Sequence, residues 1–477
     1  MVKTRIVDIS LKVCCALFVV ASLALTFTVS DYYIFNKIGY SEGEFGFFFV
    51  LSQWVKKSGL LLLPLAAYFK KNRCAQAAKY ILPAFILFSM FAFGRFFDIT
   101  MLTDDAPPAQ KVLASINEFV PKSANMALFF CAAVLELACC ALLFVRDGYK
   151  FGVNSLTHFA LAFVAVMPLN IFENLYDVNA IGRDSPLWFK NFTVWHFLML
   201  AALILCTIAY YLFLKRKRAK LQREWLCAIA FALLIQYHSK DSFVLGDGYN
   251  VYNHVFACVP LFICNIGVYI AALSVILKKR TLYSISFFVH AAGALSVFVY
   301  FGRDEISNYG IFAGHSILYF CVTHVLLFML AVLPSALGHY KFVLKDCIIP
   351  MAYYCVVIVA AALASGAVTS ASMNFSYDGY TLAESEWIYP NYAFTQINPL
   401  PIPCPTVPFM LWKCEFNLIY LIILYLVYVS MFWVFTGAYY AFKAIKRKTY
   451  RTTFFALYDN AYETAATKDS DVPSCRR

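Results

Sequence analysis

The residues best suited to chemistry are a cysteine and a histidine in separate apolar stretches of the second half of the chain. Cys264 ends the sequence Pro-Leu-Phe-Ile-Cys, and His324 ends Phe-Cys-Val-Thr-His. A thiol attacks as its thiolate, and a histidine within hydrogen-bond reach supplies the proton acceptor. We expect each residue to lie about half-way along its helix, so that their depths match. The residue types are compatible with a nucleophile and its base; the alternative is that Cys264 packs and His324 makes a helix–helix hydrogen bond.

Attack on an ester also requires a hydrogen-bond donor for the oxyanion. Asn265 and His315 are candidates, and the sequence leaves the choice between them open. Asn391 and Tyr392 are further candidates for contact with a substrate, because they lie in the long loop 369–415. The prolines that follow Asn398 favour an extended, stiff stretch of chain, and loops as long as 369–415 often cover a site.

Other polar residues within apolar stretches are candidates for function, because ionisable groups inside a membrane are energetically expensive. In the first half these are Lys57 and Glu136, whose pairing would suit a transporter. His196 and His290 also fall within apolar stretches of the chain. No cysteine spacing typical of a metal site is present, so the sequence predicts neither a metal nor a cofactor. Cys404 and Cys414, in or beside the long loop, could pair in an oxidising compartment.

The composition indicates the elements that must position these residues. Hydrophobic residues make up 62% of the 477 residues and charged residues 14%, whereas soluble domains have about 45–50% and about 25%. A soluble enzyme, a disordered chain and a fibrous protein are therefore excluded. The apolar runs are long and continuous, which favours membrane helices over a barrel.

We predict an all-α fold of about twelve transmembrane helices. Lys and Arg collect in alternate loops, which places both termini in the cytoplasm and accounts for the net charge of +12 without nucleic acid. The interaction partners predicted are membrane lipids. The predicted spans are 10–30, 46–69, 80–97, 124–145, 153–173, 192–214, 224–238, 252–277, 281–301, 311–336, 346–368 and 416–441.

The spans divide into two halves of six helices around the basic loop 215–223. Residues 1–224 form a membrane half without a recognisable motif, residues 225–442 a second half with the long outer loop, and residues 443–477 a polar cytoplasmic tail. Weak likeness between the halves is compatible with a diverged duplication in parallel orientation.

The second half resembles the YwaF family of six-helix membrane proteins, whose relatives include transmembrane protein 164. Three features carry the resemblance: the motif ending in Cys264, the motif ending in His324, and Asn391-Tyr392 before Pro399. Phe262 departs from the family pattern, because bacterial members commonly have a histidine there.

The resemblance implies a Cys–His pair that acts on lipid acyl chains, as an acyltransferase or an acyl hydrolase. Two other classes remain open from the residues alone. One is a twelve-helix secondary transporter, and the other is a non-catalytic scaffold or receptor that uses the loop rich in Tyr, Trp and Pro as a docking surface.

Overall fold

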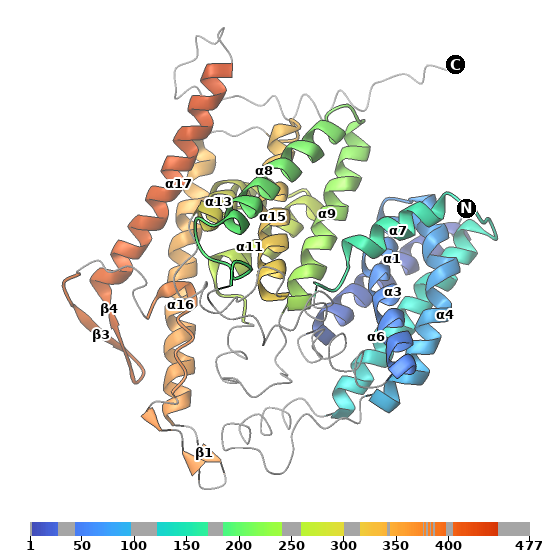
Figure 1. Cartoon of the computed structure of the whole chain (residues 1–477), viewed down its shortest axis with the longest axis horizontal. Coiled ribbons are helices and arrows are strands. Elements are labelled where there is room, and N and C mark those ends of the chain that lie inside the picture. The colour runs from blue at the N-terminus through green and yellow to red at the C-terminus, as the bar shows by residue number, and fades with distance from the viewer. Residues whose placement is uncertain are drawn as a thin grey trace.

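The computed structural model shows helices in each of the twelve segments where the sequence predicts a span (Figure 1). It describes residues 2–26, 43–96, 122–169, 185–240, 259–299, 315–340, 344–374, 376–377, 380–381, 383–384, 387–396 and 404–446. The helices are α1 (Val2–Thr26), α3 (Gly43–Tyr68), α4 (Asn72–Phe96), α6 (Lys122–Asp147), α7 (Ser155–Ala165), α8 (Val194–Leu214), α9 (Ala219–Lys240), α11 (Ile263–Leu277), α12 (Arg280–Ile285), α13 (Ala291–Val299), α15 (His315–Ala336), α16 (Ile348–Met373) and α17 (Leu418–Lys446). The prediction of an all-α multi-pass membrane protein is confirmed.

Fewer helices than the predicted twelve qualify as membrane spans when they are judged by their length and apolar character. Within the described residues, eight helices are long and apolar enough to cross a membrane: α1, α4, α6, α8, the continuous run from α12 to α13, α15, α16 and α17. Helices α7 and α11 are apolar but short, and α3 and α9 contain charged residues. The count of twelve spans is therefore not confirmed.

Proline explains the two short helices. Helix α7 ends at Ala165, just before Met167-Pro168, and α11 begins only at Ile263, after Val259-Pro260. The ring of a proline clashes with a helical conformation of the residue before it, so the chain leaves the helix there. Within the described residues, the helix in the predicted span 153–173 therefore ends at Ala165 and the helix in the predicted span 252–277 begins at Ile263.

The helices form two groups joined by α9 (Figure 1). One group contains α1, α3, α4, α6 and α7, and the other contains α8, α11, α13, α15, α16 and α17. Helix α9 packs against α3 on one side and against α11 and α15 on the other. A single hydrophobic cluster runs through both groups, including Leu63, Leu233 and Leu330. Helix α8 packs on α15 and α13, so it belongs spatially to the second group although the sequence assigns it to the first half.

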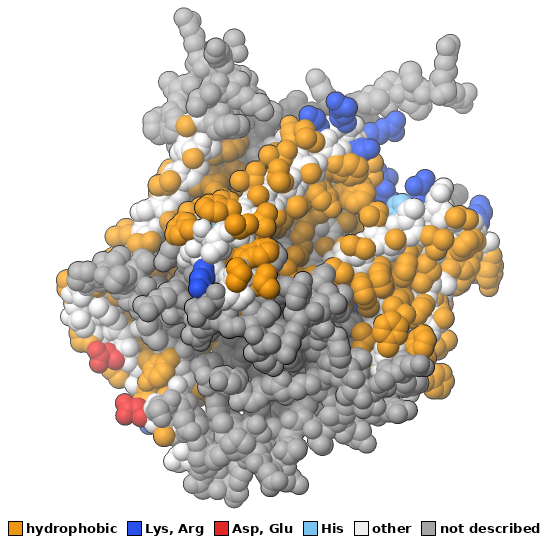
Figure 2. Space-filling view, viewed as in Figure 1, with side chains coloured by type: hydrophobic (Ala, Val, Ile, Leu, Met, Phe, Trp, Pro, Cys, Tyr) orange, Lys and Arg blue, Asp and Glu red, His pale blue; other side chains and the backbone are white. Residues whose placement is uncertain are grey.

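Exposure of apolar side chains distinguishes lipid-facing helices from central ones. Only 17% of the apolar window of α8 is buried inside the protein, compared with 67% for α15. Figure 2 shows hydrophobic side chains over the outer faces of the helices, and lysines and arginines gathered toward one end of them. We call this end, formed by residues 70–73, 146–150, 215–223 and 278–280, the basic end.

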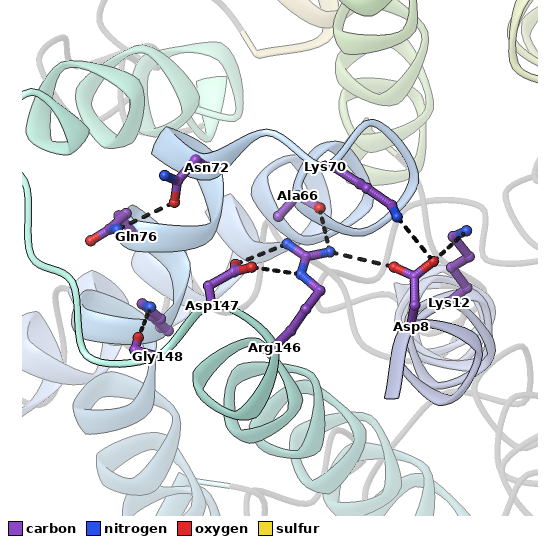
Figure 3. A network of polar contacts seen from close by, with 10 residues as sticks. Asp8, Lys12, Ala66, Lys70, Asn72, Gln76, Arg146, Asp147 and Gly148 are labelled. Carbon is purple, nitrogen blue, oxygen red and sulfur yellow. Dashed lines mark hydrogen bonds and ion pairs between the residues drawn. The ribbon is translucent and has the colours of Figure 1, made fainter. Parts of the chain in front are cut away.

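Ion pairs tie the helices together at the basic end (Figure 3). Arg146 donates to the Asp147 carboxylate at 2.8 and 2.9 Å and to the Ala66 carbonyl at 3.1 Å, and it lies 3.9 Å from Asp8. Lys12 and Lys70 also contact the Asp8 carboxylate. These contacts join α1, α3 and α6 where the helices emerge from the apolar layer.

Further short elements lie just before α16 and between α16 and α17. The 3-10 turns η5 (Leu344–Cys347) and η7 (Tyr392–Phe394) flank α16 in sequence. Two antiparallel hairpins follow α16: β1 (Ser376–Tyr377) with β2 (Tyr380–Thr381), and β3 (Pro408–Leu411) with β4 (Cys414–Asn417). Pro408 begins an edge strand, where its missing N–H costs no sheet hydrogen bond. The strands are small additions to the helical fold.

Candidate functional site

Cys264 is the second residue of α11, not a residue half-way along it. Phe262 caps the helix without a side-chain hydrogen bond, so the first amide groups of α11 lack a side-chain cap. The positive end of the helix dipole favours a negative charge at this end. The start of α11 is therefore a place where an anionic oxygen beside Cys264 would be stabilised.

The face of α11 that carries Cys264 packs closely against the helix formed by α12, η4 and α13. A Cβ placed on Gly293 would lie 3.9 Å from the Cys264 Sγ. One turn further along, a Cβ on Gly267 would lie 2.7 Å from the His290 ring. Gly267 thus allows two antiparallel helices to approach closely, and His290 lies one turn from Cys264 on the same interface.

His290 is the polar group of this interface that the sequence did not single out as a site residue. It ends the π-helical segment η4 (Ser286–His290), a type of turn that often occurs at functional sites. Its side chain is 1% exposed, and its Nε2 lies 3.2 Å from the Tyr353 hydroxyl of α16. Its Nδ1 has no hydrogen-bond partner among the described residues.

Tyrosines from two neighbouring helices lie around the thiol. Cys264 lies within electrostatic range of the hydroxyls of Tyr353 and Tyr354 on α16 and of Tyr428 on α17. The rings of Tyr354 and Tyr428 stack with centroids 5.4 Å apart, and Ile263 and Tyr353 pack against the same buried cluster. The thiol is only partly buried, so it lies in a polar corner of an otherwise apolar interface.

His324 lies in the middle of α15 and packs against the same helix as Cys264. Its ring centroid is 6.4 Å from that of Phe298 on α13, and its Nδ1 lies 2.7 Å from the Phe320 carbonyl oxygen. Both residues therefore border α13, Cys264 at Gly293 and His324 at Phe298.

Cys264 and His324 lie at similar distances along the chain from the ends of their own helices. Cys264 lies thirteen residues before the end of α11 at Leu277, and His324 lies twelve before the end of α15 at Ala336. Their neighbours on α13, Gly293 and Phe298, are five residues apart, which is about 7.5 Å along a helix. Arg223 reaches the last turn of α11, which helps to fix the level of that end.

The strap over this corner, which we define as residues 387–396, is fixed to α16 and α17. The Tyr392 amide donates to the Ser365 Oγ at 3.1 Å, and the Tyr428 hydroxyl donates to the Ala393 carbonyl at 3.3 Å. Asn391, Ala393 and Phe394 all have positive φ, of 46°, 47° and 62°. Such conformations cost free energy for residues other than glycine and occur often at functional sites.

The predicted substrate contacts differ in what their side chains do. The Asn391 side chain accepts a hydrogen bond from the Gln396 amide at 3.0 Å, which closes a turn in the strap. Tyr392 is fully buried and packs edge-on to Phe262, next to the start of α11. Asn265 is partly exposed and has no hydrogen bond to another described residue. His315 begins α15, and its side chain lies outside the described residues.

The charged residues of the first group lie apart from this corner. Glu136 of α6 is fully buried. Its carboxylate packs directly against Gly59 of α3, because a Cβ placed on Gly59 would lie only 2.2 Å from the Glu136 Oε1. The electrostatic partner of the Glu136 carboxylate is Lys56, whose ammonium lies 4.0 Å above the Phe129 ring. Lys57, proposed from the sequence as the partner, instead donates to the Ser239 Oγ of α9 at 2.5 Å.

Three further residues have defined environments that differ from a reactive site. His196 joins α8 to α13 through a hydrogen bond of 2.8 Å to the Phe298 carbonyl. Cys404 and Cys414 are free thiols, so the conditional disulfide between them is not formed. Cys414 accepts a hydrogen bond of 3.3 Å from Gln396. No group of metal ligands is present in the described part of the chain.

These features define a multi-pass helical membrane protein with a partly buried thiol at a helix start. The sequence comparison matches residues 188–428 to the TMEM164 family, and the chain belongs to this family. The match begins before α8 and covers both Cys264 and His324. No curated protein and no solved structure matches the chain. The naming as YwaF-like in the sequence analysis is compatible with this assignment.

Proposed function

We propose that the protein transfers or hydrolyses lipid acyl groups, with Cys264 as the nucleophile and His324 as the general base. The observation that carries the proposal is the position of Cys264 at the start of α11, next to α13, the helix that His324 also borders. The resemblance stated above independently implies the same pair.

The chemistry that follows uses groups of this chain alone. His324 removes the proton from Cys264, and the thiolate sulfur bonds to the carbonyl carbon of an acyl ester while the ester C–O bond breaks. The proton passes from His324 to the departing lipid oxygen. A second lipid hydroxyl or water then attacks the thioester, with His324 again accepting the proton, and the thiol is restored.

The position of the thiol suits a lipid substrate. The corner lies between apolar helices whose outer faces carry exposed leucine, isoleucine and phenylalanine side chains, such as those of α8 and α17 (Figure 2). An acyl chain could remain in the hydrocarbon layer while its ester reaches the start of α11. The strap, fixed over the corner, would limit the access of water from the loop side.

The test is acyl transfer by the purified protein in vesicles. The substrate is a mixture of phosphatidylcholine, phosphatidylethanolamine and phosphatidylserine, each with an alkyne-tagged acyl chain, with lysophospholipids as acceptors. We expect Cys264→Ala and His324→Ala to abolish transfer and release of the tag, and Cys355→Ala, which alters an exposed cysteine of α16, to retain both. Equal activity of Cys264→Ala and the wild type would reject the proposal. The transporter and the scaffold or receptor hypotheses stay untested predictions.

A further inference from the structure

We propose that the Tyr353 hydroxyl, held in place by His290, donates the hydrogen bond that stabilises the oxyanion formed when Cys264 attacks an acyl carbonyl. This inference rests on the proposed function and names the group that binds the carbonyl oxygen. It selects a donor other than Asn265 and His315, the two residues that the sequence offered.

Tyr353 lies close to the thiol. Tyr353 and Cys264 interact electrostatically, and Tyr353 packs against the same buried cluster as Ile263 and Ile266 of α11. His290, the hydrogen-bond partner of Tyr353, touches Gly267 one turn from Cys264. Three helices thus bring the hydroxyl, the imidazole and the thiol to one corner.

The hydrogen bond between His290 and Tyr353 has a preferred direction. A neutral imidazole has one N–H and one lone pair, and His290 has a single described partner, at Nε2. A buried N–H without a partner is rarer than a buried acceptor without one. This preference assigns the proton to Nε2, so that Nε2–H donates to the Tyr353 oxygen and Nδ1 keeps its lone pair.

With this assignment, the Tyr353 hydroxyl keeps its own proton available for donation. The Tyr353 O–H proton is not used in the bond to His290, and the hydroxyl has no other hydrogen bond among the described residues. Tyr428 differs, because its hydroxyl already donates to the Ala393 carbonyl. A donor that is fixed before the reaction stabilises a developing oxyanion without reorganisation cost, which is the main advantage of such sites.

Packing restricts the movement of His290 and Tyr353. His290 lies at the end of the π-helical segment, is 1% exposed, and is pressed against Gly267. The His290 and Tyr353 rings meet edge to face, with centroids 5.7 Å apart and an interplanar angle of 88°. The buried His290 ring and the edge-to-face contact therefore restrict the direction of the Tyr353 hydroxyl.

The test separates binding of the carbonyl from reactivity of the thiol. Two rates are measured on the purified protein in vesicles: formation of the tagged thioester at Cys264 from the alkyne-tagged lipids above, and alkylation of Cys264 by iodoacetamide. For Tyr353→Phe we expect thioester formation to fall about 100- to 1,000-fold, as for loss of one oxyanion donor, with alkylation unchanged. Tyr80→Phe, which changes a tyrosine of α4 in the other group of helices, is the control and is expected to retain both rates.

The role of His290 is tested through its effect on Tyr353. We expect His290→Leu to slow thioester formation about 10-fold or more, His290→Gln to restore most of the rate through its amide N–H, and the double variant His290→Leu/Tyr353→Phe to be no slower than Tyr353→Phe alone. Additive losses would overturn the positioning role.

Four other results would overturn the inference. One is an equal loss of alkylation and acylation in Tyr353→Phe, because the hydroxyl would then serve the thiol. Another is a normal rate in Tyr353→Phe with a large loss in Tyr354→Phe, because the neighbouring tyrosine would then be the donor. Finally, absence of the thioester in the wild type would reject the proposed function itself, whereas a normal thioester rate in Tyr353→Phe would reject only the role of Tyr353.

Discussion

Replacement of Gly267 by alanine is the smallest change that should separate His290 from Tyr353. A Cβ on Gly267 would lie 2.7, 2.8 and 3.1 Å from Cδ2, Cγ and Nε2 of the His290 ring. Ordinary contacts begin at 3.4 Å, so the ring must move by about 0.7 Å or the two helices must separate by that amount. The bond from Nε2 to the Tyr353 hydroxyl is 3.2 Å long, and such a movement directed away from Tyr353 would break it.

The effect on stability is the balance of two opposing contributions. Overpacking a tight interface costs about 1–3 kcal/mol. Alanine in place of glycine within a helix stabilises it by about 1 kcal/mol. We therefore expect Gly267→Ala to lower the free energy of unfolding by about 0–2 kcal/mol, and to lower the rate of thioester formation more than this small change in stability would suggest.

Two other glycines provide the controls for this substitution. A Cβ on Gly437 of α17 would meet nothing within 4 Å, so Gly437→Ala should raise the thermal midpoint and leave the thioester rate unchanged. A Cβ on Gly293 would make only an ordinary contact of 3.9 Å with the Cys264 Sγ, so Gly293→Ala should fold as the wild type does.

The assay is thermal unfolding in detergent, followed by tryptophan fluorescence, combined with the rate of thioester formation on the same preparations. If Gly267→Ala is stabilised as much as Gly437→Ala and forms the thioester at the wild-type rate, the ring of His290 does not lie against Gly267 and the reasoning is refuted. A loss of rate with the thermal midpoint within a few degrees of the wild type is the expected result.

Three further predictions concern other parts of the fold. Ser365→Ala leaves the buried Tyr392 amide without its acceptor and should destabilise the protein by about 1–3 kcal/mol, seen as faster proteolysis of the strap; an unchanged thermal midpoint and digestion pattern would contradict this. Lys56→Met and Glu136→Gln should each lower the thermal midpoint, and the double variant should lose less than both together, because it removes an interacting buried pair; strict additivity would contradict their coupling. Burial and the adjacent Asp346 carboxylate raise the pKa of Cys347 from 9.0 to about 11, so its alkylation followed by mass spectrometry should stay slow until the pH approaches that value. Because the folded thiol holds its proton more tightly than the unfolded one, its contribution to stability should fall as the pH rises above about 9, and fast reaction near neutral pH would contradict the burial.

The helical segments could be predicted from the sequence because apolar runs of membrane length have few alternatives. Their ends were less predictable for two reasons. Charged residues at the basic end continue the helices beyond the apolar run, as in α9, which begins at Ala219 where 224 was predicted. Proline acts in both directions: Pro260 delays α11, whereas Pro64, Pro83 and Pro334 lie inside helices. Packing against neighbouring helices compensates for the hydrogen bond that each internal proline removes.

The site could be predicted only in part, since its chemistry depends on contacts between helices. Cys264 and His324 were identifiable as residue types in motifs, but their common border on α13 depends on how the helices pack. His290 was visible only as a histidine in an apolar run. Its place beside Tyr353 follows from the π-helical segment and from Gly267, and neither has a sequence signal that points to Cys264. The same holds for Glu136, whose partner is Lys56 and not the adjacent Lys57.

The central claim is that Cys264 forms a thioester with a lipid acyl chain. The most direct measurement is the mass of the Cys264 peptide after brief incubation of the protein with tagged phospholipids and acid quenching. The account predicts an added acyl group on this peptide that hydroxylamine removes, that decays when lysophospholipid is added, and that is absent in Cys264→Ala. An unmodified Cys264 peptide under conditions in which the protein still moves acyl groups between lipids would contradict the account.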